Sequence, residues 1–166
     1  AAQFAMPEKV ADRSESATWE AEKARMAEVR RREIANGGKL VLHRACLHGY
    51  AATVSEVLRM EGVNVNETSS NGATGLCLAS ENGHSDVVKL LLGVEGIDVN
   101  HADSNGFTAL YIASEKGHVD VMKLLLGTEG IDVNQAKDNG ATALIVASQE
   151  GFLDVIQVLL CVENID

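Results

Sequence analysis

From residue 37 onward the chain alternates between two kinds of short apolar run, and the alternation recurs at a fixed distance. In its clearest copy the first run covers residues 110–115, the second covers 120–126, and Gly117 lies between them. Apolar residues three and four positions apart within the runs predict two short helices. A glycine just after a helical run is typical of a left-handed cap that ends the helix. The pattern therefore predicts a helix–turn–helix unit that is repeated along the chain.

The same pattern sets the expected bounds of the other helices. We expect first helices at 76–81, 110–115 and 144–149, and second helices at 86–92, 120–126 and 154–160. A threonine precedes each first helix, where its hydroxyl can cap the helix start: Thr74, Thr108 and Thr142. An Asn-Gly pair precedes each threonine and predicts a tight hairpin turn, because this pair accepts positive φ at low cost.

The unit has a period of thirty-four residues, and two of its copies are closely alike. Residues 71–104 and 105–138 are identical at 23 of 34 positions. A fixed period of this length is typical of a stacked-repeat protein, or solenoid. One unit is too small to bury its own apolar face, so neighbouring units have to stack. We expect units at about 37–70, 71–104, 105–138 and 139–166. A stack of such units favours a recognition surface over a catalytic cleft.

Residues 1–36 form a tail with a different pattern. Beyond Asp12, a capping residue, the tail is rich in Ala, Glu, Lys, Arg and Met without Gly or Pro, which predicts a helix over roughly 13–35. Its apolar stripe is narrow and includes Trp19 and Met26. The helix is therefore either a solvated helix that leans on the first repeat, or an arm that docks on a partner through Trp19 and Met26.

Composition and charge restrict the core and the partner. Hydrophobic residues make up 46% of the chain and aromatic residues only 4%, so the core has to be built from Leu, Val, Ile and Ala. The net charge of −10 lies on residues 37–166, which carry seven Lys/Arg and seventeen Asp/Glu, whereas residues 1–36 carry seven of each. Nucleic acid binding normally needs clustered Lys and Arg. We therefore do not expect nucleic acid as a direct ligand.

Cysteine usage bears on the compartment. Cys46, Cys77 and Cys161 are an odd number without close pairing, which fits a reducing intracellular compartment better than a disulfide framework. No apolar run approaches the roughly 20 residues that a membrane span needs, and no hydrophobic secretory segment opens the chain. We therefore expect the protein to be located in the cytoplasm. Ala1 is either a cloning remnant or the end left by removal of a targeting peptide, and the second case favours an organelle.

The repeated unit resembles the ankyrin repeat. The residues that carry the resemblance are 105–110 (Asn-Gly-Phe-Thr-Ala-Leu), 117–121 (Gly-His-Val-Asp-Val), 124–126 (Leu-Leu-Leu) and 132–134 (Asp-Val-Asn). They recur in register over residues 37–166, with one residue more per copy than the usual 33. The resemblance implies an all-α ankyrin solenoid of about four repeats with short hairpin loops, preceded by the N-terminal helix.

The family's Thr-Pro-Leu-His motif departs from its usual form in this chain. Its proline is absent from every copy, and its histidine, which in the family bridges neighbouring repeats by hydrogen bonds, is present only as His43. Cys77, Tyr111 and Ile145 stand in its place in the other copies. We therefore expect weaker polar ties between repeats and an unchanged apolar stack.

The resemblance also implies a binding surface, because ankyrin arrays bind other proteins with hairpin tips and with the exposed side of the first helices. Carried over by position, the partner-binding residues are Glu67, Ser70, Glu81, Asn82, His101, Ser104, Asn105, Phe107, Tyr111, Glu115, Lys116, Gln135, Asp138, Asn139, Gln149 and Glu150. Phe107 either anchors a partner or lies over the neighbouring tip, and Tyr111 either faces a partner or fills the volume of the missing histidine.

The implied function is non-catalytic protein binding, as an adaptor, a scaffold or a subunit of a larger assembly. The acidic repeats predict a partner with a basic patch. Two alternatives are a regulatory ankyrin module of a longer enzyme and an assembly or targeting factor inside an organelle. The fold by itself does not name the partner.

Candidate chemistry is sparse. No phosphate-binding loop, serine-nucleophile elbow or zinc-protease motif is present, and we predict neither a catalytic site nor a cofactor. His43, Cys46 and His48 supply at most three metal ligands where a structural zinc site wants four, so we expect no metal. His84 and His118, one period apart, are expected to be helix-start residues.

The C-terminal repeat shows no switch to a polar outer face. A terminal repeat normally carries one, because nothing further covers it. Here six residues of the last copy match or exceed the apolarity of the inner copies: Val155, Ile156, Val158, Leu159, Leu160 and Val162. The sequence therefore predicts that further chain or another subunit covers this end.

Overall fold

Eight short helices make up the part of the chain that the computed structural model describes, which is residues 39–163 and Ile165. The helices are α2 (Lys39–Leu47), α3 (Ala51–Leu58), α4 (Gly75–Glu81), α5 (Ser85–Leu92), α6 (Ala109–Lys116), α7 (Val119–Leu126), α8 (Ala143–Glu150) and α9 (Leu153–Leu160). The predicted N-terminal helix, with Trp19 and Met26, lies outside the described residues.

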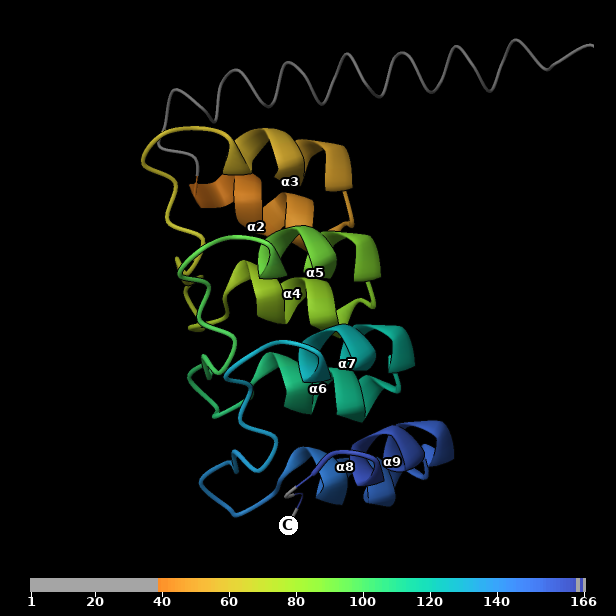
Figure 1. The fold of residues 1–166 in the computed structure, drawn as a ribbon. Coiled ribbons are helices and arrows are strands. Elements are labelled where there is room, and N and C mark those ends of the chain that lie inside the picture. Colours follow the sequence, from red (N-terminus) through yellow and green to blue (C-terminus); the bar gives the residue numbers. More distant parts are fainter. Residues whose placement is uncertain (1–38, 164, 166) are drawn as a thin grey trace, which may run out of the picture. The chain divides into compact units, whose positions relative to one another are not determined.

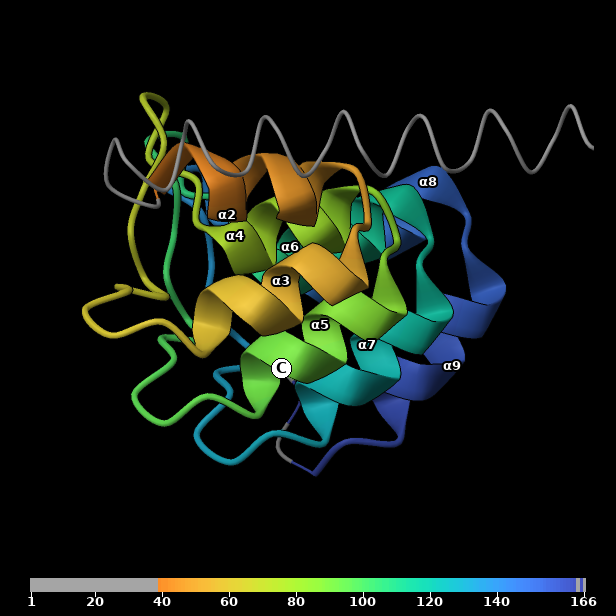
Figure 2. The same cartoon turned by 90° about the horizontal axis from the view of Figure 1, so that it is seen from above.

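The helices form two layers, as Figures 1 and 2 show. α2, α4, α6 and α8 pack side by side in one layer, and α3, α5, α7 and α9 do so in the other. Each helix contacts its partner in the same repeat and its equivalent in the neighbouring repeat. The predicted all-α solenoid of helix–turn–helix repeats is therefore confirmed.

The helix starts follow from the threonine caps. The Oγ1 atoms of Thr74, Thr108 and Thr142 accept hydrogen bonds from backbone N–H groups three residues later, at 3.4, 3.1 and 3.4 Å. Because the capping residue directly precedes the first helical residue, these helices begin at Gly75, Ala109 and Ala143. This is one residue earlier than the apolar pattern alone predicts.

Asn-Gly turns form the tips of short hairpins. Gly106 has φ of +79°, in the left-handed region, and its N–H donates to the carbonyl oxygen of Asp103 at 2.9 Å. Isolated antiparallel bridges join Thr68 with Thr74 and Ala102 with Thr108. The predicted hairpin loops are therefore present, and they project from the first-helix layer.

A continuous aliphatic core runs through both layers, and its stacking needs small residues at the start of the first helices. A Cβ atom on Gly75 would lie 3.0 Å from the Sγ atom of Cys46 in the previous repeat, closer than ordinary van der Waals contact. Ala109 and Ala143 occupy the equivalent positions, and both are buried. The close approach buries large side chains from both layers, including Leu76, Leu91, Leu110 and Leu125.

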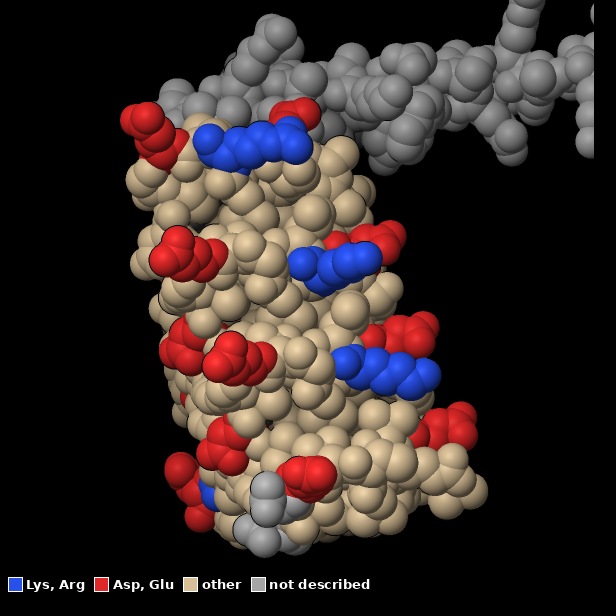
Figure 3. Space-filling view, viewed as in Figure 1, with Lys and Arg blue, Asp and Glu red and all other residues tan. Residues whose placement is uncertain are grey.

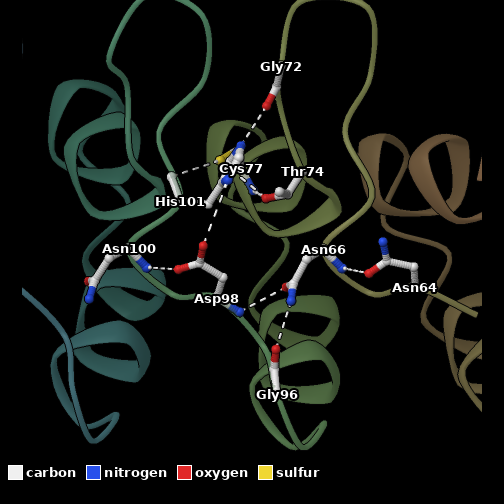
Figure 4. Close-up of polar contacts among 9 residues, drawn as sticks. All are labelled: Asn64, Asn66, Gly72, Thr74, Cys77, Gly96, Asp98, Asn100 and His101. Atoms are coloured by element: carbon white, nitrogen blue, oxygen red, sulfur yellow. Dashed lines mark hydrogen bonds and ion pairs between the residues drawn. The ribbon is translucent and has the colours of Figure 1, made fainter.

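Several polar bonds between repeats come from residues outside the altered Thr-Pro-Leu-His motif. The Nε2 atoms of His84 and His118 donate to the carbonyl oxygens of Leu47 and Glu81, each at 3.1 Å. In Figure 4, the side chain of Asn66 joins two backbone groups of the next loop. Its Nδ2 donates to Gly96 O at 2.7 Å, and its Oδ1 accepts from Asp98 N at 2.8 Å. These bonds supply the ties that the missing motif histidines do not.

We predict that Leu125→Ala destabilises the fold by about 2–5 kcal/mol, because it removes a fully buried side chain from the stacking interface. The free energy of unfolding is measured by denaturant titration. Leu160→Ala, the same truncation at an exposed position of α9, is the matched control and should change stability by less than about 0.5 kcal/mol. Equal effects of the two substitutions would contradict the packing described above.

Candidate protein-binding surface

The described residues include a groove that crosses from the second repeat to the third. It has a volume of about 220 Å³ and lies between the hairpin tips and the first helices. Its lining residues are Asn71, Ala73, Cys77, Glu81, Asp103, Asn105, Phe107, Ile112 and Glu115. Four sequence-predicted contact residues from the exposed helix faces and one hairpin therefore meet here: Glu81, Asn105, Phe107 and Glu115.

The groove is acidic. Three carboxylates line it, and its lining includes no basic side chain. Asp103 is fixed by the turn, because its Oδ1 accepts from the N–H groups of Asn105 at 2.8 Å and Phe107 at 2.9 Å. Glu115 lies 3.1 Å from the ammonium of Lys116, and its hydrogen bond and charge raise the pKa of Lys116. Glu81 is exposed at the end of α4.

Acidic side chains are also prominent beyond the groove. On the face shown in Figure 3, they follow the loop edge of the stack from level to level, and others lie beside the basic side chains over the helices. The excess of Asp and Glu on residues 37–166 therefore covers an extended surface and is not confined to one cluster.

Phe107 is half-buried and has neighbours on its own and on the next repeat. Its ring centroid lies 5.2 Å from that of Tyr111, and the Nζ atom of Lys137 lies over the ring at 3.8 Å from the centroid. Lys137 belongs to the next hairpin, so the structure shows the arrangement in which Phe107 packs against the neighbouring tip. The ring also lines the groove, where it offers an apolar wall beside the carboxylates.

Tyr111 belongs to the packing between repeats and not to the binding surface. It is only 6% exposed, so its ring offers a partner almost no area. Burial, followed by the nearby carboxylates of Glu115 and Glu150, raises the pKa of Tyr111. The ring fills the position of the missing family histidine, and this burial corrects its assignment as a contact residue.

His101 links neighbouring hairpins. Its Nε2 donates to the carbonyl oxygen of Gly72 at 2.9 Å, and its Nδ1 lies 3.8 Å from a carboxylate oxygen of Asp98, as Figure 4 shows. The side chain is 27% exposed. The equivalent residue in the next repeat is Gln135, so the histidine does not recur with the repeat period. The repeat pattern therefore did not predict this bond. His101 is first of all a structural bridge, with one edge near the predicted surface.

The remaining predicted contact residues divide by exposure. The exposed ones are Ser70, Asn82, Ser104, Lys116, Asp138, Asn139, Gln149 and Glu150, and the half-buried ones are Glu67 and Gln135. They lie on the hairpins and first helices of successive repeats, so they extend the surface on both sides of the groove without forming one compact site.

Two of the three thiols are buried and poorly suited to chemistry. Burial raises the pKa of the Cys46 thiol to about 12, and burial also raises that of Cys77. Both side chains therefore stay neutral thiols near neutral pH, and a neutral thiol is a weak nucleophile. Cys161, in contrast, is exposed at the end of α9.

Among residues 39–163 and Ile165, no three His, Cys, Asp or Glu side chains gather closely enough to hold a metal ion. His43 is buried within α2, whereas His48 is exposed in the turn that follows this helix. No helix in this part of the chain is both long and apolar enough to cross a membrane.

Stacked helix pairs, hairpin tips and the groove between them define a repeat protein built for contact with other molecules. The model of the family described as ankyrin repeats (3 copies) matches residues 42–137 and 94–166. The chain therefore belongs to the ankyrin-repeat family, whose members are generally protein-interaction modules. A search of the curated proteins finds no match.

We predict that a thiol reagent modifies one cysteine rapidly in the folded chain near neutral pH, because Cys161 alone among the three is exposed. Cys46 and Cys77 should react only as fast as the chain opens. Reaction is followed by absorbance and mass spectrometry. The control is Cys161→Ser, which should lose the fast phase entirely, and a second fast-reacting thiol would disprove the burial of the other two.

Proposed function

We propose that this chain is a non-catalytic protein-binding subunit, an adaptor or scaffold, and that it binds a basic segment of its partner along the hairpin tips and first helices. The groove between the second and third repeats carries the proposal, because three carboxylates and one aromatic ring converge there. An Arg or Lys side chain fits this chemistry, since its charge meets the carboxylates and its methylene stem packs on Phe107.

The charge of the whole stack supports the same partner. Residues 37–166 carry ten more acidic than basic side chains, so they attract a basic protein surface from a distance and repel phosphate. Nucleic acid is therefore not the proposed ligand. Association with a basic partner should slow as salt rises, because screening weakens long-range attraction.

The proposed setting is a reducing compartment, the cytoplasm or an organelle, since two thiols are buried and none is paired among the described residues. A partner that binds along the hairpin tips and the first helices leaves the two ends of the stack available for further contacts. We therefore include cover of the C-terminal face by further protein in the proposed role as a subunit.

The test selects peptides from a random display library against the full chain. We expect enrichment of Arg and Lys, and we expect the selected peptides to bind the double variant Glu81→Gln, Glu115→Gln roughly tenfold more weakly. Each substitution keeps the shape of the side chain and removes one charge from the groove. Affinity is measured by fluorescence anisotropy at two salt concentrations.

The matched control is the double variant Glu95→Gln, Glu129→Gln. It removes the same charge from exposed loops that follow α5 and α7, away from the groove. The control should retain nearly the wild-type affinity. Peptides without basic residues, or an equal loss in both double variants, would show that the groove is not the binding site.

A further inference from the structure

One carboxylate of the acidic groove already holds a cation of the same chain. The Nζ atom of Lys116 lies 3.1 Å from the Oε2 atom of Glu115. Both side chains remain accessible, since 45% of Lys116 and 32% of Glu115 are exposed. Glu115 lines the groove and Lys116 does not, so the chain supplies this counter-ion from beside the groove. A basic residue of a partner therefore meets a carboxylate that is already paired.

The two other carboxylates of the groove are in different states. Asp103 is engaged by its own hairpin turn, where it accepts hydrogen bonds from two backbone N–H groups. The side chain of Glu81 makes no hydrogen bond or ion pair with any residue that the structure describes. In the same part of the chain, Lys116 is the only Lys or Arg that forms an ion pair with a groove carboxylate. Lys116 therefore determines how much of the groove's negative charge is open to a partner.

The second repeat shows the same helix end without the cation. Asn82 follows Glu81 as Lys116 follows Glu115, one repeat later. The Nδ2 atom of Asn82 donates to the backbone oxygen of Leu78 at 2.9 Å, and Glu81 stays unpaired. An uncharged residue at this position is therefore compatible with the same fold.

Nearby carboxylates favour the charged form of Lys116. The hydrogen bond to Glu115 and the charge of Glu115 raise the pKa of Lys116, and the charges of Glu81 and Glu150 raise it further. Glu150 belongs to the next repeat and does not line the groove. The ammonium thus keeps a negative neighbour when it leaves Glu115. An ion pair that is this exposed to water is weak, so a partner's cation can replace it.

We propose that Lys116 is an internal competitor of the partner: it occupies Glu115 in the free protein, and a basic residue of the partner displaces it on binding. This inference rests on the proposed function, because it assumes that the groove binds a basic segment. Two cations at one carboxylate repel each other, so binding exchanges one ion pair for another. Lys116 therefore lowers the affinity of the groove for basic segments, and tight binding needs further contacts, such as packing on Phe107.

The test compares the full chain with Lys116→Gln. The probe is a fluorescein-labelled peptide with the basic sequence that the display selection enriches most. Glutamine keeps a long side chain that suits a helix and removes the charge. We expect Lys116→Gln to bind the peptide roughly two- to fivefold more tightly, a range set by the strength of an exposed ion pair. Affinity is measured by fluorescence anisotropy at physiological ionic strength, where charges are screened over about 8 Å.

Lys89→Gln is the matched control. It removes the same charge from an exposed position of α5, in the layer of second helices. It should change the affinity by less than about 1.5-fold, because it touches no carboxylate of the groove. The unfolding temperature shows that each variant is folded. An equal gain in both variants, or no gain in Lys116→Gln, would overturn the proposal.

A second comparison asks whether Lys116 acts through Glu115. In the Glu115→Gln background, Lys116→Gln should no longer tighten binding, since the carboxylate for which it competes is gone. A gain that persists there would come from net charge alone and would also overturn the proposal. Failure of the proposed function is seen separately, as selected peptides without basic residues or as unchanged binding by the double variant Glu81→Gln, Glu115→Gln. Either of those results would overturn this inference as well.

Discussion

The close approach of successive first helices is the contact on which the rest of the structure depends. At its tightest described point the helices are so near that a Cβ atom on Gly75 would lie 3.0 Å from Cys46. Gly or Ala occupies this register position in the second, third and fourth repeats, and the repeat length of thirty-four residues keeps it in phase. Because one unit cannot bury its own apolar face, each repeat is stable only against its neighbours.

This stacking also builds the candidate site, which no single repeat contains. Glu81 comes from the second repeat, Glu115 from the third, and the ring of Phe107 is held by Tyr111 beside it and Lys137 on the following hairpin.

The sequence predicts those parts of the fold that local chemistry determines. The threonine caps, the left-handed glycines and the Asn-Gly turns are all where the pattern predicts them, with helix starts displaced by one residue because Thr108 and its equivalents cap directly. Contacts between repeats were harder to predict. The burial of Tyr111 and the bond from His101 to Gly72 depend on which side chains neighbouring hairpins bring together, and these positions do not repeat in sequence.

Hydrogen exchange of the backbone amides in the intact chain tests most directly whether neighbouring repeats stabilise one another. If stability resides in the interfaces, amides of α4 and α6, which are packed on both sides, should exchange slowest. Amides of α8 and α9 should exchange faster by about tenfold or more, through local opening of a repeat that is packed on one side only. Equal protection of α6 and α8 would contradict the account, because it would mean that a repeat needs no second neighbour.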